Sequence, residues 1–198
     1  GIPTTFFLRS HKHYTLGRPL VEEIIISTYQ SEKYLLKAFE DHDITRIHGV
    51  SPEKISTISV ATSSIKTSLL PRTFAVFFNP NKLTPLANKN VRVALQMAIN
   101  KQAIVDTVLL HYGKVINTPY PFDSEDTENL YDPVQAKELL IKSKALKTAS
   151  STLEITLVTI NTDEMKKVSE MIKGYWEAIG VKTNVVIYDV SDLNQNII

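Results

Sequence analysis

The stretch that most constrains the fold of this chain spans residues 70–106. It opens with residues 73–78, a run of β-branched, aromatic and small side chains that predicts a strand. Pro80 has no N–H for a sheet ladder, so we expect the strand to end at Asn79. Residues 91–99 are apolar on nearly every side, which predicts a helix that is buried over most of its surface.

Asparagine and arginine side chains give this stretch the signals of helix ends and of one polar stripe. Asn88 is expected to cap the first helix, and Asn100 to cap a second helix over residues 101–111, before Gly113. Arg92, Gln96 and Asn100 recur at four-residue intervals and therefore form a single polar stripe. The pattern predicts one strand followed by two packed helices.

The order of residues in this stretch resembles the central signature of the family 5 bacterial extracellular solute-binding proteins, the peptide and nickel receptors of ABC importers. The signature reads N-x-x…P-(L/F)…(D/N)-x-x-V-R-x-A-(L/I)-x-x-A-I-(D/N)-(K/R)-x-x-I-V. The matching residues are Asn79, Pro85, Leu86, Asn88, Val91, Arg92, Ala94, Leu95, Ala98, Ile99, Asn100, Lys101, Ile104 and Val105. The resemblance implies an α/β chain, a fragment of a two-lobed periplasmic-binding-protein-like (type II) fold with mixed sheets.

The first part of the chain matches further family segments in the right order, beginning with Leu8, Arg9, Tyr14 and Pro19. Apolar runs predict strands over residues 6–9, 21–26 and 44–50. Ser31 is expected to cap a helix over residues 32–40, and Pro52 to open a short one. Residues 57–68 are expected to pair antiparallel with residues 74–78 through a turn at 70–72. By resemblance, this second strand crosses between the lobes.

The last part of the chain predicts a helix followed by a β-α-β unit. The segment Y-D-P-x-x-A-x-x-L-L, which the family shares, places Asp132 as a cap and Pro133 at the first helical position. A basic linker over residues 142–151 precedes a strand over residues 153–158. A helix over residues 163–179 ends at Gly180, and a strand follows over residues 181–188. We expect the two strands to be parallel, with a right-handed crossover.

The resemblance divides the chain into residues 1–78, the second segment of lobe I ending in the crossing strand, and residues 79–198, the first half of the other large lobe. In some peptide-binding relatives, alternate side chains of the crossing strand face the ligand. Here those side chains are Ala75, Phe77 and Asn79, which share one face of a strand. For Phe77, a plain core position is the alternative. The main ligand anchors are expected beyond Ile198, so the isolated chain should bind peptide weakly or not at all.

Composition limits the function classes. With 22 Lys and Arg against 21 Asp and Glu, the chain lacks the basic excess of a nucleic-acid-binding protein. It has no Cys, which excludes disulfides and thiolate catalysis. The resemblance implies a non-enzymatic substrate-binding component without a cofactor, on the extracytoplasmic side, in the periplasm or tethered to the outer face of the membrane. Its partners would be an oligopeptide or related small solute, bound between the lobes, and a membrane permease.

Two alternatives compete with this interpretation. A metal-dependent or acid–base α/β hydrolase would use His11, His13 and His42, with nearby Asp41 and Asp43. No His-Glu-x-x-His, Gly-x-Ser-x-Gly or phosphate-loop motif supports it, and we expect the chain to need no metal. A protein-interaction or signalling domain built on the receptor fold is the other alternative, which the sequence does not separate from transport.

Overall fold

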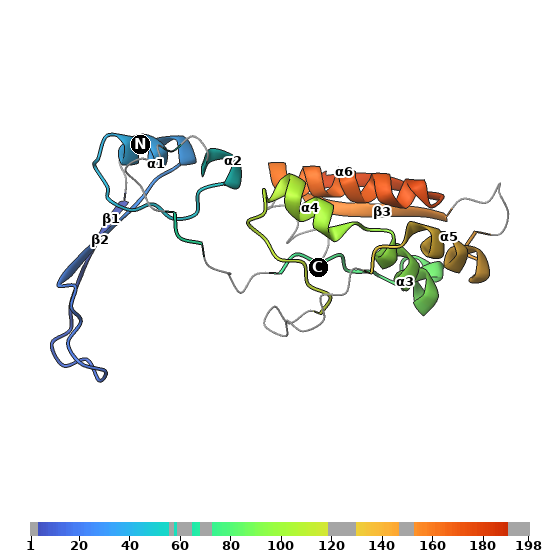
Figure 1. Cartoon of the computed structure of the whole chain (residues 1–198), viewed down its shortest axis with the longest axis horizontal. Coiled ribbons are helices and arrows are strands. Elements are labelled where there is room, and N and C mark those ends of the chain that lie inside the picture. The colour runs from blue at the N-terminus through green and yellow to red at the C-terminus, as the bar shows by residue number, and fades with distance from the viewer. Residues whose placement is uncertain are drawn as a thin grey trace. The chain divides into compact units, whose positions relative to one another are not determined.

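The computed structural model describes residues 4–55, 58, 65–67, 73–118, 130–146 and 153–189. The chain divides into two compact units, Gly1–Ile65 and Lys66–Ile198 (Figure 1). The division between the lobes of a receptor, drawn from the resemblance at residue 78, remains a prediction.

The first unit is built on an antiparallel hairpin. Strand β1 (Thr4–Arg9) pairs with β2 (Glu23–Thr28), so that Phe6 lies opposite Ile26 and Leu8 opposite Ile24. Helix α1 (Glu32–Glu40) and the single turn α2 (Pro52–Ile55) follow. The presence of these two strands, α1 and the opening of α2 at Pro52 confirm the predictions for these segments, and their antiparallel pairing was not predicted.

The strand predicted over residues 44–50 is wrong, because this segment has no regular secondary structure. Its half-buried side chains are Ile44, Ile47 and Val50, a spacing of three rather than the two of a strand. His42, just before the segment, and Gly49, within it, have positive φ angles of 62° and 76°, which are incompatible with an extended strand.

The second unit holds a parallel two-stranded sheet and most of the helices. Its elements are the 3-10 helix η1 (Thr84–Ala87), α3 (Lys89–Met97), α4 (Lys101–Val108), α5 (Pro133–Lys142), β3 (Leu153–Ile160), α6 (Asp163–Ala178) and β4 (Val181–Tyr188). Strands β3 and β4 pair in parallel, from Leu153 opposite Val181 to Ile160 opposite Tyr188. Helix α6 connects them and packs on both strands (Figure 1). The predicted parallel β-α-β unit is confirmed.

Three of the four predicted helix caps form side-chain bonds, whereas Ser31 before α1 makes no side-chain cap hydrogen bond. The Oδ1 atom of Asn88 accepts the N–H of Asn90 at 2.9 Å, and that of Asn100 accepts the N–H of Ala103 at 3.0 Å. At α5, the Oδ1 atom of Asp132 accepts the N–H of Gln135 at 2.8 Å. These side chains replace hydrogen-bond partners that the first turn of a helix lacks.

The helix ends agree less evenly with the sequence. Gly180 has a φ of 91° and its N–H donates to the carbonyl of Glu177 at 3.0 Å, which confirms its role after α6. Helix α4 stops at Val108 instead of residue 111. Leu110 and His111 have φ angles of 46° and 68°, and this left-handed backbone cannot continue a helix.

Trp176 lies at the centre of the core of the second unit. Its side chain is 0% exposed, and its Nε1–H donates to the carbonyl of Leu95 at 3.0 Å. This bond joins α6 to α3, which also packs against α5. The buried core cluster comprises Leu86, Val91, Ala94, Leu95, Ala98, Ala136, Leu140, Leu153, Ile155, Ile172, Trp176, Ile179 and Val181. The predicted burial of α3 is therefore confirmed, with Arg92 and Gln96 only half-buried.

Candidate functional site

Residues 73–79 of the second unit form an irregular segment and not the predicted strand. Its predicted partner, residues 57–68, lies largely outside the described residues. Side-chain packing helps to fix the segment. Val76 and Phe78 pack against the core, and the ring of Phe78 lies 6.3 Å from that of Trp176, measured between centroids. Two side chains, two residues apart, therefore anchor the segment to the core.

The three predicted site residues share the opposite side of this segment. Ala75, Phe77 and Asn79 are all exposed, between the half-buried Val76 and Phe78. Phe77 is 92% exposed, so the alternative that it is a core residue is wrong. An isolated exposed phenylalanine is common on protein surfaces, but here its half-buried neighbours on both sides pack against the core. The arrangement presents an aromatic ring on a backbone that the core holds in place.

Asn79 is committed to the turn that follows the segment. Its Oδ1 atom accepts the N–H of Asn81 at 3.0 Å and the N–H of Lys82 at 3.3 Å, which closes the chain around Pro80. Any ligand contact by this side chain therefore depends on its Nδ2 donors.

Arg92 supports the same region from α3. Its Nη1 atom donates to the carbonyl of Leu86 at 2.7 Å and to that of Ala87 at 3.0 Å, at the end of η1. These carbonyls have no partner within the short helix, so the guanidinium satisfies them and ties η1 to α3. In the sequence, Arg92 stood out as part of a polar stripe and as a match to the family signature, and neither showed this contact. Its position six residues after Leu86 gives no periodic signal that would have revealed the contact.

Lys101 has a comparable role at the start of α4. Its Nζ atom donates to the carbonyl of Ile116 at 3.1 Å and to the Oδ1 atom of Asn117 at 2.8 Å. Partial burial lowers the pKa of this ammonium group, because desolvation disfavours its charged form. Lys101 therefore ties residues 116 and 117, in the segment after α4, to the start of that helix. The sequence matched Lys101 to the family signature but did not indicate this contact.

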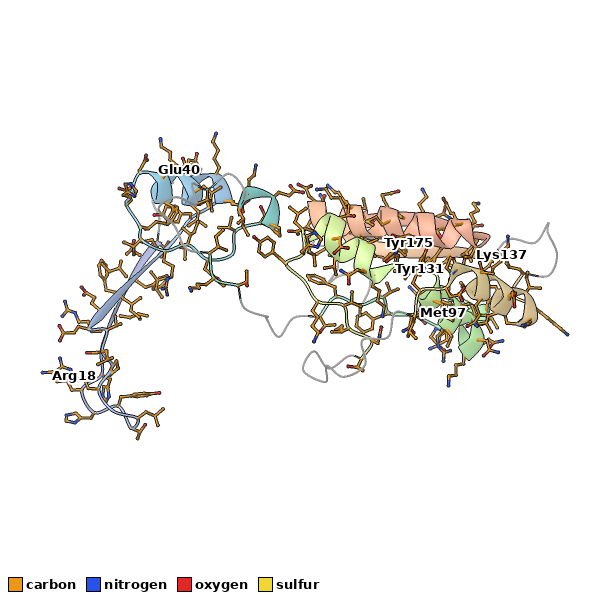
Figure 2. The ribbon with its side chains drawn as sticks, in the orientation of Figure 1. Arg18, Glu40, Met97, Tyr131, Lys137 and Tyr175 are labelled. Atoms are coloured by element: carbon orange, nitrogen blue, oxygen red, sulfur yellow. The ribbon has the colours of Figure 1, made fainter. Side chains whose placement is uncertain are left out.

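Two tyrosines meet where α5 begins. The rings of Tyr131 and Tyr175 lie 6.1 Å apart at 62°, and the two residues are labelled in Figure 2. Burial, and to a smaller degree the neighbouring Tyr131, raises the pKa of the Tyr175 hydroxyl. The N–H of Asp132 donates to the carbonyl of Met97 at 2.9 Å, which links this corner to α3. The ring contact and this backbone bond hold α3, the start of α5 and α6 together at this corner.

The structure does not assemble the residues of the hydrolase alternative into a site. His11 and His13 are exposed in the loop after β1, with ring centroids 6.2 Å apart. His42 and Asp41 form the turn that ends α1, and both side chains are exposed, as is that of Asp43. Among the described residues, no group of three or more His, Cys, Asp or Glu side chains is arranged to hold a metal ion.

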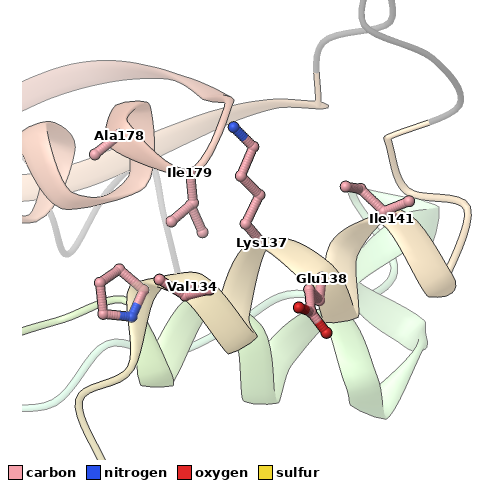
Figure 3. A pocket seen from close by; sticks show the side chains of 7 residues that line it. Val134, Lys137, Glu138, Ile141, Ala178 and Ile179 are labelled. Atoms are coloured by element: carbon pink, nitrogen blue, oxygen red, sulfur yellow. The ribbon is translucent and has the colours of Figure 1, made fainter.

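A shallow groove of about 330 Å³ lies between α5 and the end of α6 (Figure 3). Its lining residues are Pro133, Val134, Lys137, Glu138, Ile141, Ala178 and Ile179. None of them was predicted as a site residue. A solute-binding site needs several polar groups that converge on the ligand, and this largely aliphatic groove offers only Lys137 and Glu138.

Within the described residues, no helix is both long and apolar enough to span a membrane.

Curated relatives match part of the chain. Di/tripeptide-binding protein 1 of Pseudomonas aeruginosa is 32% identical over 111 residues, which make up 53% of this chain and 21% of that protein. Heme-binding protein A of Haemophilus influenzae is 32% identical over 123 residues, 59% of this chain and 22% of that protein. The matched part of the chain thus spans about a fifth of the length of these relatives.

Solved structures share the fold over nearly the whole chain. The nickel ABC transporter structure from Bacillus halodurans has a TM-score of 0.76 at 18% identity, covering 96% of this chain and 42% of that one. The oligopeptide-binding protein AppA of Bacillus subtilis, solved with a nonapeptide, has a TM-score of 0.63 at 20% identity, covering 96% and 41%. The family model of the bacterial extracellular solute-binding proteins, family 5 middle, matches residues 4–197. The chain belongs to this family.

Proposed function

We propose that this chain is part of the substrate-binding component of an ABC importer, one that binds an oligopeptide or a related small solute between two lobes. The bound solute would then pass to a membrane permease on the extracytoplasmic side of the cell. Family membership supports a binding protein over the alternative of a hydrolase, which would use His11, His13 and His42. The mechanism is closure of the lobes around the solute, in which no covalent bond changes.

The exposed face of residues 73–79 is the observation that carries this proposal. Phe77 projects from a segment whose neighbours Val76 and Phe78 are fixed against the core. A fixed aromatic ring can cover an apolar side chain of a ligand without first losing much conformational entropy. We therefore propose Ala75, Phe77 and Asn79 as ligand contacts, the first two apolar and the third through its amide donors.

A peptide is the favoured solute class. Relatives at 32% identity are named as a di/tripeptide-binding protein and as a heme-binding protein, whereas the nickel protein resembles this chain at 18% identity. Identity at that lower level supports a common fold and says little about the ligand. An exposed phenylalanine also suits a peptide side chain better than a hydrated metal ion.

Isothermal titration with a mixed library of di- to pentapeptides tests this proposal. The protein used is a receptor of the relatives' length that contains these residues. We expect the receptor to bind, and Phe77→Ser to weaken its affinity about tenfold, as for a residue that fills an apolar contact. The 198-residue chain alone should give little or no heat, because half of a cleft leaves the ligand hydrated.

Phe7→Ser is the matched control, since Phe7 is also an exposed phenylalanine but lies on the hairpin of the first unit. It should leave the affinity unchanged. Absence of peptide binding by the receptor would overturn the proposed function. An equal loss of affinity in both variants would remove Phe77 from the site while leaving the function in place.

A further inference from the structure

Residues 73–79 contact a tryptophan that belongs to another element, helix α6. We propose that Trp176 is a positioning residue for the ligand contact Phe77, and that it acts through Phe78. Trp176 is fully buried, so it is not itself part of the ligand surface. This inference rests on the proposed function and adds to it the residue that sets the place of Phe77.

The indole of Trp176 is held at its polar edge as well as by packing. Its side chain is 0% exposed, and its Nε1–H donates to the carbonyl of Leu95 at 3.0 Å. Leu95 lies in the last turn of α3, where carbonyls lack a partner inside the helix. The N–H of Ile99, which would close the next helical bond, donates to Gln96 instead. The indole therefore satisfies a carbonyl at a helix end, and turning the ring would break a buried bond.

The ring of Phe78 packs against this fixed indole. The two ring centroids lie 6.3 Å apart and the ring planes are inclined by 32°, which is within the range in which aromatic pairs attract one another. Phe78 is half-buried and packs against the core cluster, of which Trp176 is a member. Trp176 is therefore one of the buried residues that set how deep Phe78 lies.

Phe77 takes its position from its neighbours along the chain. One planar peptide unit joins it to Phe78 and keeps the two Cα atoms about 3.8 Å apart. Beyond Phe78, Asn79 accepts the N–H groups of Asn81 and Lys82 and closes a turn. A shift of Phe78 relative to the core therefore displaces the backbone of Phe77 as well. A mobile or displaced ring must be ordered on binding, which lowers the affinity.

A positioning role differs from a purely structural one in its effect on the ligand. If Trp176 only stabilises the fold, its replacement lowers stability, but the folded receptor keeps its affinity. If Trp176 positions Phe77, its replacement lowers the affinity of the folded receptor, and it does so only while the ring of Phe77 is present. A double-mutant cycle measures this dependence directly.

Isothermal titration of the receptor of the relatives' length with the mixed di- to pentapeptide library supplies the cycle. Among variants that circular dichroism shows to be folded, Trp176→Leu should lower the affinity about fivefold, and Trp176→Phe, which retains a ring, about twofold. With Phe77→Ser already in place, Trp176→Leu should cost no further affinity. Leu140→Ala is the control, because it truncates the same core from α5 and should leave the affinity unchanged. Additive losses in the cycle, or an equal loss for Leu140→Ala, would overturn the proposal.

A measurement without ligand separates this inference from the proposed function. Nitrogen-15 relaxation of the 198-residue chain reports the order of the Phe77 backbone amide. We expect an order parameter near ~0.85 in the unaltered chain and in Leu140→Ala, and below ~0.6 in Trp176→Leu. If Trp176→Leu fails to fold, Trp176→Phe replaces it, with a smaller fall expected. Absence of peptide binding would overturn the function, whereas an unchanged order parameter in the folded tryptophan variant would overturn the positioning role alone.

Discussion

The two units of this chain contain strands of similar hydrophobicity but differ in what covers them. In the second unit, α6 packs on β3 and β4, and the core beneath it includes a Trp176 that is 0% exposed. In the first unit, β1 and β2 have aliphatic and aromatic side chains that remain about half exposed. Apolar sequence alone therefore does not produce a core, because a sheet needs a second layer against which to bury its face.

The difference also separates local from tertiary sources of stability. Helix α1 of the first unit has the predicted bounds, although Ser31 makes no side-chain cap hydrogen bond. Helices α3, α4 and α5 of the second unit have capping bonds and a shared core. We expect the free energy of unfolding to reside mainly in the second unit, and the following changes test this expectation.

Trp176→Ala should have the largest effect. Removing a fully buried indole typically costs about 3–5 kcal/mol of unfolding free energy, and the carbonyl of Leu95 would also lose its donor. Urea unfolding followed by circular dichroism measures this loss. Trp176→Phe should be milder, because it retains part of the ring volume. A loss below about 1 kcal/mol for Trp176→Ala would contradict the central position of this residue.

A pair of truncations compares the two units directly. Leu140→Ala in the second unit should cost about 2–5 kcal/mol, because the side chain is fully buried. Ile26→Ala on β2 of the first unit should cost less than about 1 kcal/mol, because nearly half of the side chain already contacts water. Both are measured by urea unfolding at low protein concentration. Equal losses would mean that the first unit has a core of comparable strength.

The elements that the sequence predicts well are those decided by nearby residues. Asn88, Asn100, Asp132 and Gly180 mark helix ends through bonds to atoms within four residues, and all four occupy the expected positions. The parallel β-α-β unit followed from two apolar runs around one amphipathic helix. Such signals do not depend on the rest of the molecule.

The failures are segments whose structure depends on distant partners. Residues 44–50 and 73–78 have strand-like composition, yet neither forms a strand in the described part of the chain. Composition alone does not supply the partner that a strand needs. For the second segment, Val76 and Phe78 pack against the core while Ala75, Phe77 and Asn79 are exposed, but Phe74 is exposed as well, so the alternation holds only from Ala75 onward. Arg92 and Lys101 were matched to the family, but their carbonyl partners depend on the fold and could not be read from spacing.

Asn100→Ala and Ser31→Ala sharpen the comparison at the level of helix caps. The first removes the acceptor for the N–H of Ala103 and should lower the unfolding free energy by about 1 kcal/mol. The second removes a hydroxyl group that makes no cap bond, and it should change the unfolding free energy by a few tenths of a kcal/mol at most. Urea midpoints measured by circular dichroism distinguish the two. A larger effect at Ser31 would show that α1 depends on its cap more than its geometry indicates.

Glu154→Gln should have the smallest effect, and one that depends on pH. Hydrogen bonds from Lys182 and Asn184 lower the pKa of this carboxyl group, so it binds protons more weakly in the folded state. Its contribution is therefore present above the pKa of the unfolded chain and is lost as pH falls through the lower folded value. Urea midpoints of the two proteins should differ slightly near neutral pH and converge in acid. A difference that grows toward acid pH would contradict this assignment.

The matched pair Phe77→Ala and Phe78→Ala tests most directly whether residues 73–79 present one face to the core and the other to a ligand. Phe78 contacts Trp176, whereas Phe77 is 92% exposed. Urea unfolding should show a loss of roughly 2 kcal/mol or more for Phe78→Ala and less than about 0.5 kcal/mol for Phe77→Ala. Equal losses, or a larger loss at Phe77, would contradict the account, because the proposed ligand face would then be part of the core.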